Sequence, residues 1–277
     1  LVLRYFLGNE AEGPGPYKNS SAACDTSYTG LNNQVAEFQG DFCKYTNPNE
    51  SWFLHNSKGE RLYDEWFPGR ITYHMNPASS GWRAFARQRM IEGSREFDGV
   101  FLDNVELDIY KKTNQLENSD GTVKEFANND AYRAAWADYL KYLGEGIRQN
   151  GDELWGNLVN DRHTGTYWDL YQPYMDGFLL ENFATGYDPL EPDRWDRQLQ
   201  QAERALAAGK GLMLTGRGNQ SETAKQTFGL ASYLLVTNGG EAYFRWSNSS
   251  KYGEWWQYEN YNVQLGAAKG ARYKQTD

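Results

Sequence analysis

The 277-residue sequence lacks the features that mark several large classes of protein. No apolar run approaches the roughly 20 residues that a membrane-spanning helix needs, so we expect no membrane span. Basic residues are neither in excess nor clustered, since 28 Lys and Arg stand against 37 Asp and Glu and give a net charge of -9. A chain of this charge repels polyanions, which argues against nucleic acid as a partner.

Histidine is also scarce, and known cofactor motifs are missing. The three histidines, His55, His74 and His163, show no metal-ligand spacing, and no serine elbow accompanies them. The glycine-rich stretch 209–218 matches neither the dinucleotide fingerprint nor the P-loop. The sequence therefore predicts no cofactor.

Only two cysteines occur, Cys24 and Cys43, in a polar region rich in Gly and Asn. A disulfide between them would close a loop of about 20 residues and would suit a secreted protein. A pair of free buried thiols is the alternative reading. We expect the oxidised form and a location outside the cytosol.

Aromatic residues are abundant, at 16% of the chain with 10 Trp and 20 Tyr, and many lie among polar residues. Such side chains can pack at the rim of a fold with their polar tips in water. As a population they also suggest surfaces that stack on sugar rings.

Short apolar runs alternate with longer amphipathic stretches, which is typical of βα units around a parallel sheet. We expect strands at residues 1–8, 52–55, 71–75, 100–102, 154–158, 177–180, 211–215 and 241–246. We expect helices at 81–97, 130–149, 193–208 and 221–236. Asp130 is the expected N-cap of the helix at 130–149, and Ser221 is the expected N-cap of the helix at 221–236.

Eight candidate strands fit one α/β domain over 1–277, a TIM-type (β/α)8 barrel, which typically takes about 250 residues. Residues 9–70 are rich in loops, so the early strands are the least secure. We expect the barrel to lack N-terminal strands, with a segment before Leu1, and further domains to lie outside the chain.

Two segments 78 residues apart echo each other: FDGVFLDN at 97–104 and MDGFLLEN at 175–182. Each has Asp-Gly before a three-residue apolar run and a carboxylate followed by Asn after it. Asp-Gly suits a tight turn, and the apolar run suits a strand covered on both faces. Asp103 and Glu181 are thereby placed at the carboxyl ends of parallel strands, where active sites of barrels are built.

Glycoside hydrolysis needs two such carboxyl groups, one to protonate the leaving oxygen and one to act as nucleophile or to activate water. Asp103 and Glu181 are the predicted catalytic pair. Glu106 is a rival to Asp103, and Asp108 is a weaker one. We expect Glu181, after two leucines, to be the general acid, and Asp103 to stay ionised because Asn104 and Asn157 can donate hydrogen bonds to it.

The same two motifs resemble glycosyl-hydrolase-like barrel families related to endo-α-1,4-polygalactosaminidases, together with the upstream runs Trp52-Phe53-Leu54, Met75-Asn76-Pro77 and Trp82-Arg83. The resemblance covers about residues 50–250. It implies a barrel glycosidase with Asp103 in the nucleophile position and Glu181 as acid/base, and it leaves the substrate open.

Residues at or just beyond other strand ends are candidates for binding a carbohydrate substrate. Amide, acidic and guanidinium groups can hydrogen-bond sugar hydroxyls, and aromatic rings can stack on them. The candidates are Tyr5, Asn104, Glu106, Trp155, Asn157, Asn160, Asn182, Arg217, Tyr243 and Trp246.

Two other functions fit the same residues. A barrel that binds carbohydrate without cleaving it would use the aromatic residues and acids as a holding surface. A divalent-metal enzyme would bind its ion through Asp103, Glu106 and Glu181. We expect the hydrolase, acting on an oligo- or polysaccharide.

Overall fold

The computed structural model describes residues 1–14, 40–67, 70–110, 116–158, 167–185, 192–237, 239–248, 251, 253–267 and 269–273. They form two compact units, one of Leu1–Asn160 with Pro173–Met175 and one of Asp161–Gln172 with Asp176–Asp277. Within these residues, no helix combines the length and apolarity required to cross a membrane.

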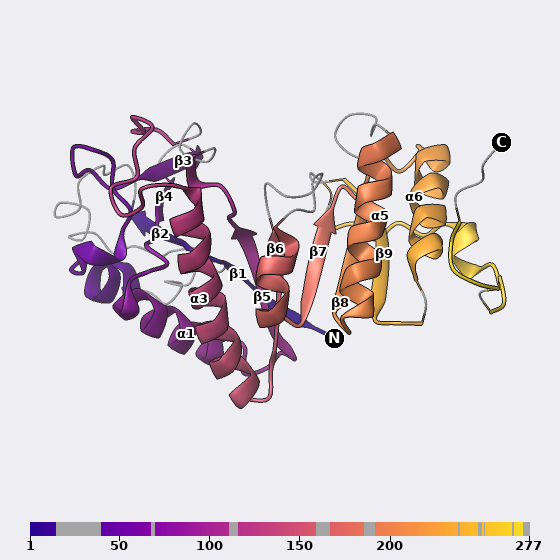
Figure 1. Ribbon diagram of the computed structural model, residues 1–277, viewed down its shortest axis with the longest axis horizontal. Coiled ribbons are helices and arrows are strands. Elements are labelled where there is room, and N and C mark those ends of the chain that lie inside the picture. Colours follow the sequence, from indigo (N-terminus) through magenta and orange to yellow (C-terminus); the bar gives the residue numbers. More distant parts are fainter. Residues whose placement is uncertain are drawn as a thin grey trace. The chain divides into compact units, whose positions relative to one another are not determined.

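Three parallel strands form the centre of the first unit, in the order β1 (Leu3–Leu7), β5 (Gly99–Val105) and β6 (Glu153–Leu158). The helices α1 (Ser80–Gly93) and α3 (Asn129–Gln149) pack on each other, and α3 covers β6 (Figure 1). Successive side chains of these strands point to opposite faces of the sheet. The apolar side chains on one face are fully buried, and those on the other face lie beside polar side chains.

A small antiparallel sheet follows β1, in the order β2 (Glu10–Pro14), β4 (Arg70–His74) and β3 (Tyr63–Phe67). Its register places Ala11 opposite Tyr73 on a buried apolar face, and Glu10 opposite His74 on the other face. A π-helix and a 3-10 helix precede β3, at Phe42–Thr46 and Glu50–Trp52.

The polar face of this small sheet is buried. Glu10, Glu12, Asp64 and His74 are each at most 5% exposed. His74 Nε2 lies 2.8 Å from Asp64 Oδ2, which gives both buried polar side chains a partner.

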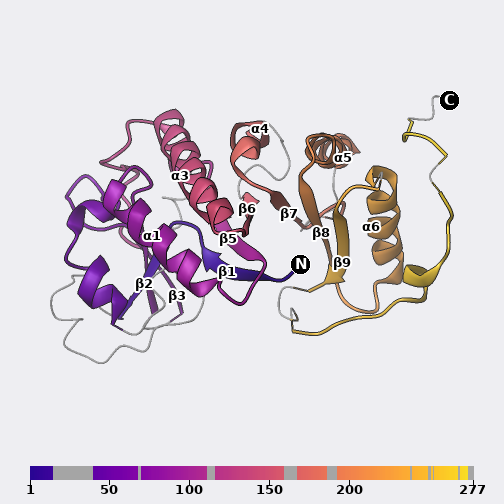
Figure 2. The same cartoon turned by 90° about the horizontal axis from the view of Figure 1, so that it is seen from below.

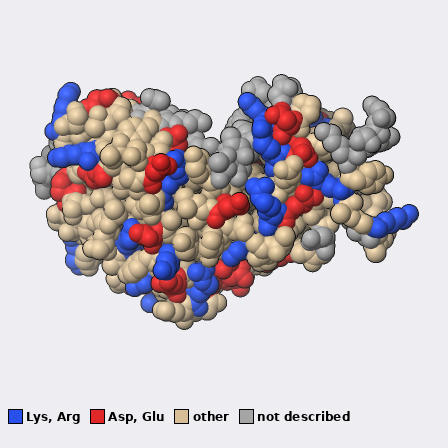
Figure 3. Space-filling view, viewed as in Figure 1, with Lys and Arg blue, Asp and Glu red and all other residues tan. Residues whose placement is uncertain are grey.

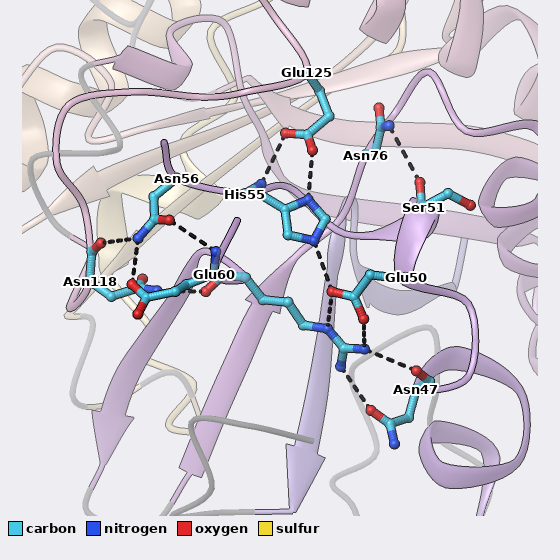
Figure 4. Close-up of polar contacts among 10 residues, drawn as sticks. Asn47, Glu50, Ser51, His55, Asn56, Glu60, Asn76, Asn118 and Glu125 are labelled. Carbon is cyan, nitrogen blue, oxygen red and sulfur yellow. Dashed lines mark hydrogen bonds and ion pairs between the residues drawn. The ribbon is translucent and has the colours of Figure 1, made fainter. Parts of the chain in front are cut away.

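The segment 116–126 follows the predicted catalytic strand and is tied to the segment 50–61, which precedes β3, by a polar cluster (Figure 4). His55 lies between two carboxylates, with Nδ1 2.6 Å from Glu125 Oε1 and Nε2 2.9 Å from Glu50 Oε1. Its backbone N–H also donates to Glu125 Oε2 at 2.9 Å. Arg61 completes the cluster by donating from Nε to Glu50 Oε1 at 2.9 Å. We call these four residues the His55 clamp.

The second unit contains the parallel strands β7 (Gly177–Glu181), β8 (Gly211–Arg217) and β9 (Ala242–Ser247). The helices α5 (Pro192–Ala207) and α6 (Thr223–Val236) pack on each other and on β8, and α6 also packs on β9 (Figure 2). The short elements are α4 (Trp168–Tyr171), the 3-10 turn Gln172–Tyr174 and the 3-10 turn Glu259–Asn262.

Most of the expected elements are present, and six of them form two sets of three parallel strands. The prediction of a parallel α/β fold is therefore confirmed, whereas closure into a barrel stays a prediction, as does the single domain. Residues 52–55 are not a strand: they contain the end of a 3-10 helix and isolated bridges at Phe53 and His55. Residues 71–75 correspond to β4, which pairs with antiparallel neighbours.

Two expected helix caps are corrected. Asn128, not Asp130, caps α3, because its side chain accepts from the Ala131 N–H at 2.9 Å while Asp130 lies in the first turn. The N-cap position of α6 is Glu222 rather than Ser221, and it makes no side-chain cap hydrogen bond.

Cys43 is disulfide-bonded. Cys24, the only other cysteine of the sequence, lies outside the described residues.

Candidate functional site

The carboxylate of Asp103 accepts three hydrogen bonds at the carboxyl-terminal part of β5. The Tyr5 hydroxyl donates to Oδ2 at 2.5 Å. The Asn157 side-chain amide donates to Oδ1 at 3.0 Å, and the backbone N–H of Asn104 donates to the same oxygen at 2.9 Å. Every one of these contacts uses the carboxylate as acceptor, which is the form in which it can act as nucleophile or base.

Strand register explains why these groups meet. Leu7 is paired with Asp103 and Tyr5 with Phe101, so Tyr5 and Asp103 lie on one face, two residues apart along the strand direction. The rings of Tyr5 and Phe101 stack, with centroids 5.9 Å apart and an interplanar angle of 24°. The phenol therefore leans along the strands toward the carboxyl end, where its hydroxyl reaches Asp103.

The asparagine after each predicted carboxylate has a left-handed backbone, with φ of 55° at Asn104 and 60° at Asn182. Asparagine adopts this conformation more readily than other residues with a side chain, except aspartate. The echo between the two sequence segments is thus also an echo in backbone conformation. At Asn104 the turn lets the side-chain amide donate to Glu10 Oε1 at 3.2 Å.

Sequence analysis missed Glu10. This residue is 2% exposed and begins β2 only three residues after β1 ends, so it comes close to Asn104. The available signal was an acid directly beyond the first parallel strand. It was hidden because the following residues, Ala-Glu-Gly-Pro, have low strand propensity.

Glu181 ends β7 in the second unit, where it pairs with Thr215 of β8 and is half-buried. The chain then turns sharply, and the Phe183 N–H donates to the Thr215 carbonyl at 2.8 Å. Leu179 shares the face of Glu181, while Phe178 and Leu180 are fully buried on the opposite face. Asp103 and Glu181 belong to different units, so their pairing stays a prediction.

The two rivals of Asp103 are placed as follows. Asp108 accepts from the Asn129 side-chain amide at 2.7 Å, which ties it to the start of α3. Glu106 is 5% exposed, directly beyond the end of β5.

Two predicted sugar-stacking residues have covered rings. Trp155 is 0% exposed and donates from Nε1 to Glu153 Oε2 at 2.6 Å. Trp246 is 1% exposed and packs so closely on Gly216 that a Cβ there would lie 2.7 Å from its ring. Both side chains contribute to the core, and neither enters the proposal made for the site.

The remaining candidates lie in the second unit or outside the described residues. Arg217 ends β8 and donates its backbone N–H to Thr185 Oγ1 at 3.0 Å. Tyr243 is 49% exposed, with its hydroxyl donating to Glu241 Oε1 at 3.0 Å. Asn182 is 2% exposed, and its side-chain nitrogen has no hydrogen-bond partner among the residues that the structure describes. Asn160 lies outside the described residues.

Charge is mixed on the molecular face drawn in Figure 3, where basic and acidic side chains are interspersed. Among the residues that the structure describes, no three or more His, Cys, Asp or Glu side chains are arranged to hold a metal ion.

The sequence model GHL15, described as hypothetical glycosyl hydrolase family 15, matches residues 16–276. This match includes both carboxylate segments. No curated protein matches the chain.

Three solved structures are similar at low identity. Aspergillus fumigatus Ega3 in complex with galactosamine is 14% identical, with a TM-score of 0.44 over 72% of this chain and 66% of that chain. The glycoside hydrolase domain of PelA from Pseudomonas aeruginosa is 18% identical, with a TM-score of 0.43 over 65% of this chain and 66% of that chain. A Paenibacillus sp. cycloisomaltooligosaccharide glucanotransferase complexed with cycloisomaltoheptaose is 15% identical, with a TM-score of 0.42 over 65% of this chain and 25% of that chain. The match spans just under two thirds of the first two chains.

Proposed function

The chain belongs to hypothetical glycosyl hydrolase family 15, which confirms the expected glycoside hydrolase. From that premise we propose that it cleaves an oligo- or polysaccharide, with Asp103 as nucleophile and Glu181 as acid/base. The observation that carries the proposal is the set of three donors on the Asp103 carboxylate. A nucleophile must be fixed in direction, and three hydrogen bonds to the carboxylate provide this.

The proposed reaction has two steps. Asp103 attacks the anomeric carbon while the bond to the leaving oxygen breaks, and Glu181 transfers its proton to that oxygen. Glu181 then takes a proton from water, whose oxygen displaces the Asp103 carboxylate. This chemistry requires the two carboxyl groups to lie about 5–5.5 Å apart, against about 6.5–9.5 Å for an inverting pair.

The first experiment identifies the substrate by digesting a glycan panel and analysing the products by mass spectrometry. A dinitrophenyl glycoside of the sugar that is cleaved then separates the two roles, because its leaving group needs no protonation. Glu181→Ala should keep most of its glycosylation rate on this compound while losing roughly 100- to 10,000-fold on the natural linkage. Asp103→Ala should lose activity on both.

Azide provides the stereochemical check. It should rescue Glu181→Ala with a glycosyl azide of retained configuration, because the glycosyl-enzyme still forms. It should rescue Asp103→Ala with inverted configuration, because azide then attacks directly. Equal losses for both variants on the dinitrophenyl compound contradict the roles, and loss of wild-type turnover in EDTA favours the metal enzyme instead.

We also propose that the parallel strands belong to a closed (β/α)8 barrel. In the described residues, β1 pairs only with β5 and β9 only with β8, which leaves one free edge on each. A barrel of this type has eight strands, so closure requires partners for both of these edges. Hydrogen exchange tests the closure, since edge amides of β1 and β9 exchange slowly only if they are paired.

A location outside the cytosol is proposed from the disulfide at Cys43. Intact-mass measurement after alkylation, with and without reductant, should show two blocked thiols only after reduction. Two thiols that react without reductant contradict the proposal.

A further inference from the structure

Tyr5 was expected to stack on sugar, but its contacts indicate a different task. We infer that Tyr5 is a positioning residue for Asp103, and that Oδ2, the oxygen that its hydroxyl contacts, attacks the anomeric carbon. This inference rests on the proposed role of Asp103 as nucleophile.

The acceptor capacity of the carboxylate identifies the attacking oxygen. A carboxylate has about four lone-pair positions, two on each oxygen. Oδ1 accepts from Asn104 and from Asn157, so both of its positions are used. Among the described residues, Oδ2 accepts only from Tyr5. The remaining electron pair is therefore on Oδ2, and this pair forms the bond to carbon as the leaving oxygen departs with the proton from Glu181.

The phenol also matters when the glycosyl-enzyme is hydrolysed. As water attacks, the bond between the anomeric carbon and Oδ2 breaks, and the electron pair returns to Oδ2 as negative charge. The Tyr5 hydroxyl, 2.5 Å from this atom in the free enzyme, already points at the place where the charge develops. A donor preorganised in this way stabilises the transition state without further rearrangement.

The ring of Tyr5 is poorly placed for the stacking role. Phe101 covers one of its faces in a nearly parallel arrangement. The pairing of β1 with β5 places the two residues side by side on one face, which keeps Phe101 beside the ring of Tyr5. The ring thus sets the height of the hydroxyl, and the hydroxyl contacts Asp103.

Tyr5→Phe separates the two roles because it keeps the ring and removes only the hydroxyl. On the dinitrophenyl glycoside, where deglycosylation limits turnover, kcat should fall roughly 10- to 100-fold with KM unchanged or lower. A stacking residue would lose nothing in this variant. The matched control is Tyr110→Phe, which removes a hydroxyl that donates to the Phe126 carbonyl in the same unit and should leave kcat unchanged.

A second measurement does not depend on activity. In protein labelled with 13C at aspartate carboxyl carbons, the Asp103 resonance at a fixed pH should change its chemical shift in Tyr5→Phe, because the carboxylate loses its donor at Oδ2. It should not change in Tyr110→Phe. If no glycoside is cleaved, the proposed function fails while this result still decides the contact. An unchanged Asp103 resonance, or unchanged kcat in an active Tyr5→Phe enzyme, overturns the inference.

Discussion

Replacing His55 by glutamine removes the only group of the His55 clamp whose charge changes near neutral pH. The ring is 10% exposed and lies between the carboxylates of Glu125 and Glu50, which are 18% and 59% exposed. The better buried contact, to Glu125, raises the pKa of His55 above its ordinary 6.5 more strongly than any other interaction, and the contact to Glu50 adds to it. Burial acts in the opposite direction.

The sign of the pH dependence follows from these shifts. A histidine whose pKa is higher in the folded state stabilises that state fully below about pH 6.5, and the stabilisation is lost as the pH rises through the folded-state pKa. Glu50 behaves in the opposite sense, because hydrogen bonds from Arg61 lower its pKa from 4.5 to about 2. Its contribution is present above pH 4.5 and is lost toward pH 2. The clamp therefore stabilises most between about pH 4.5 and 6.5.

The magnitude can be estimated from the contacts. A hydrogen bond between charged, mostly buried groups is worth about 1.5–3 kcal/mol, and this range applies to the contact with Glu125. The contact with the exposed Glu50 adds less than about 1 kcal/mol. For a chain of this size each 1 kcal/mol corresponds to about 2–4 °C in Tm, so His55→Gln should lower Tm by roughly 3–16 °C at pH 5.5.

Differential scanning calorimetry at pH 5.5 and pH 8.5 measures this loss. The difference between wild type and His55→Gln should be largest at pH 5.5 and should shrink at pH 8.5. Lys251→Gln is the control, because its pair with Glu254 is exposed and should contribute little at either pH. A loss that is equal at the two pH values, or greater at pH 8.5, refutes the assignment of charge to His55.

Two further predictions concern backbone and packing. Asn104→Val should destabilise by about 1–2 kcal/mol in thermal unfolding, because a β-branched residue is strained at φ 55°. Asn104→Gly is the control: it should keep Tm and lose only the contact with Glu10. Equal losses of stability in the two variants contradict the argument. Gly216→Ala should destabilise by about 1–3 kcal/mol in urea unfolding, since the added Cβ would meet the Trp246 ring at 2.7 Å; a neutral Gly216→Ala contradicts the packing. Gly253→Ala, whose added Cβ would have no described atom within 4 Å, should be neutral.

The strands could be predicted where local sequence was sufficient. Three-residue apolar runs after Asp-Gly identify β5 and β7, because such a run is stable only when covered on both faces. Periodicity does not specify the partner, and β4 therefore appeared equivalent to the parallel strands. β2 was missed because Glu-Ala-Glu-Gly-Pro forms a strand only through its pairing with β4.

The site was predictable to the same extent. The position of Asp103 at a strand end follows from the sequence around it, but its donors do not. Tyr5 is 98 residues away, and only the register of β1 against β5 makes the two side chains neighbours. Composition indicated an excess of aromatic rings, yet it could not tell that Trp155 and Trp246 would be buried.

The left-handed asparagines have a consequence for protein engineering. Gly99–Asn104 and Gly177–Asn182 have the same length, start at glycine and end at an asparagine with nearly equal φ, so the two backbones are interchangeable to a first approximation. A chimera that carries one segment in both places would exchange aspartate for glutamate, or the reverse, without altering the turn that follows. The length of the acidic side chain could in this way be varied without changing the backbone that carries it.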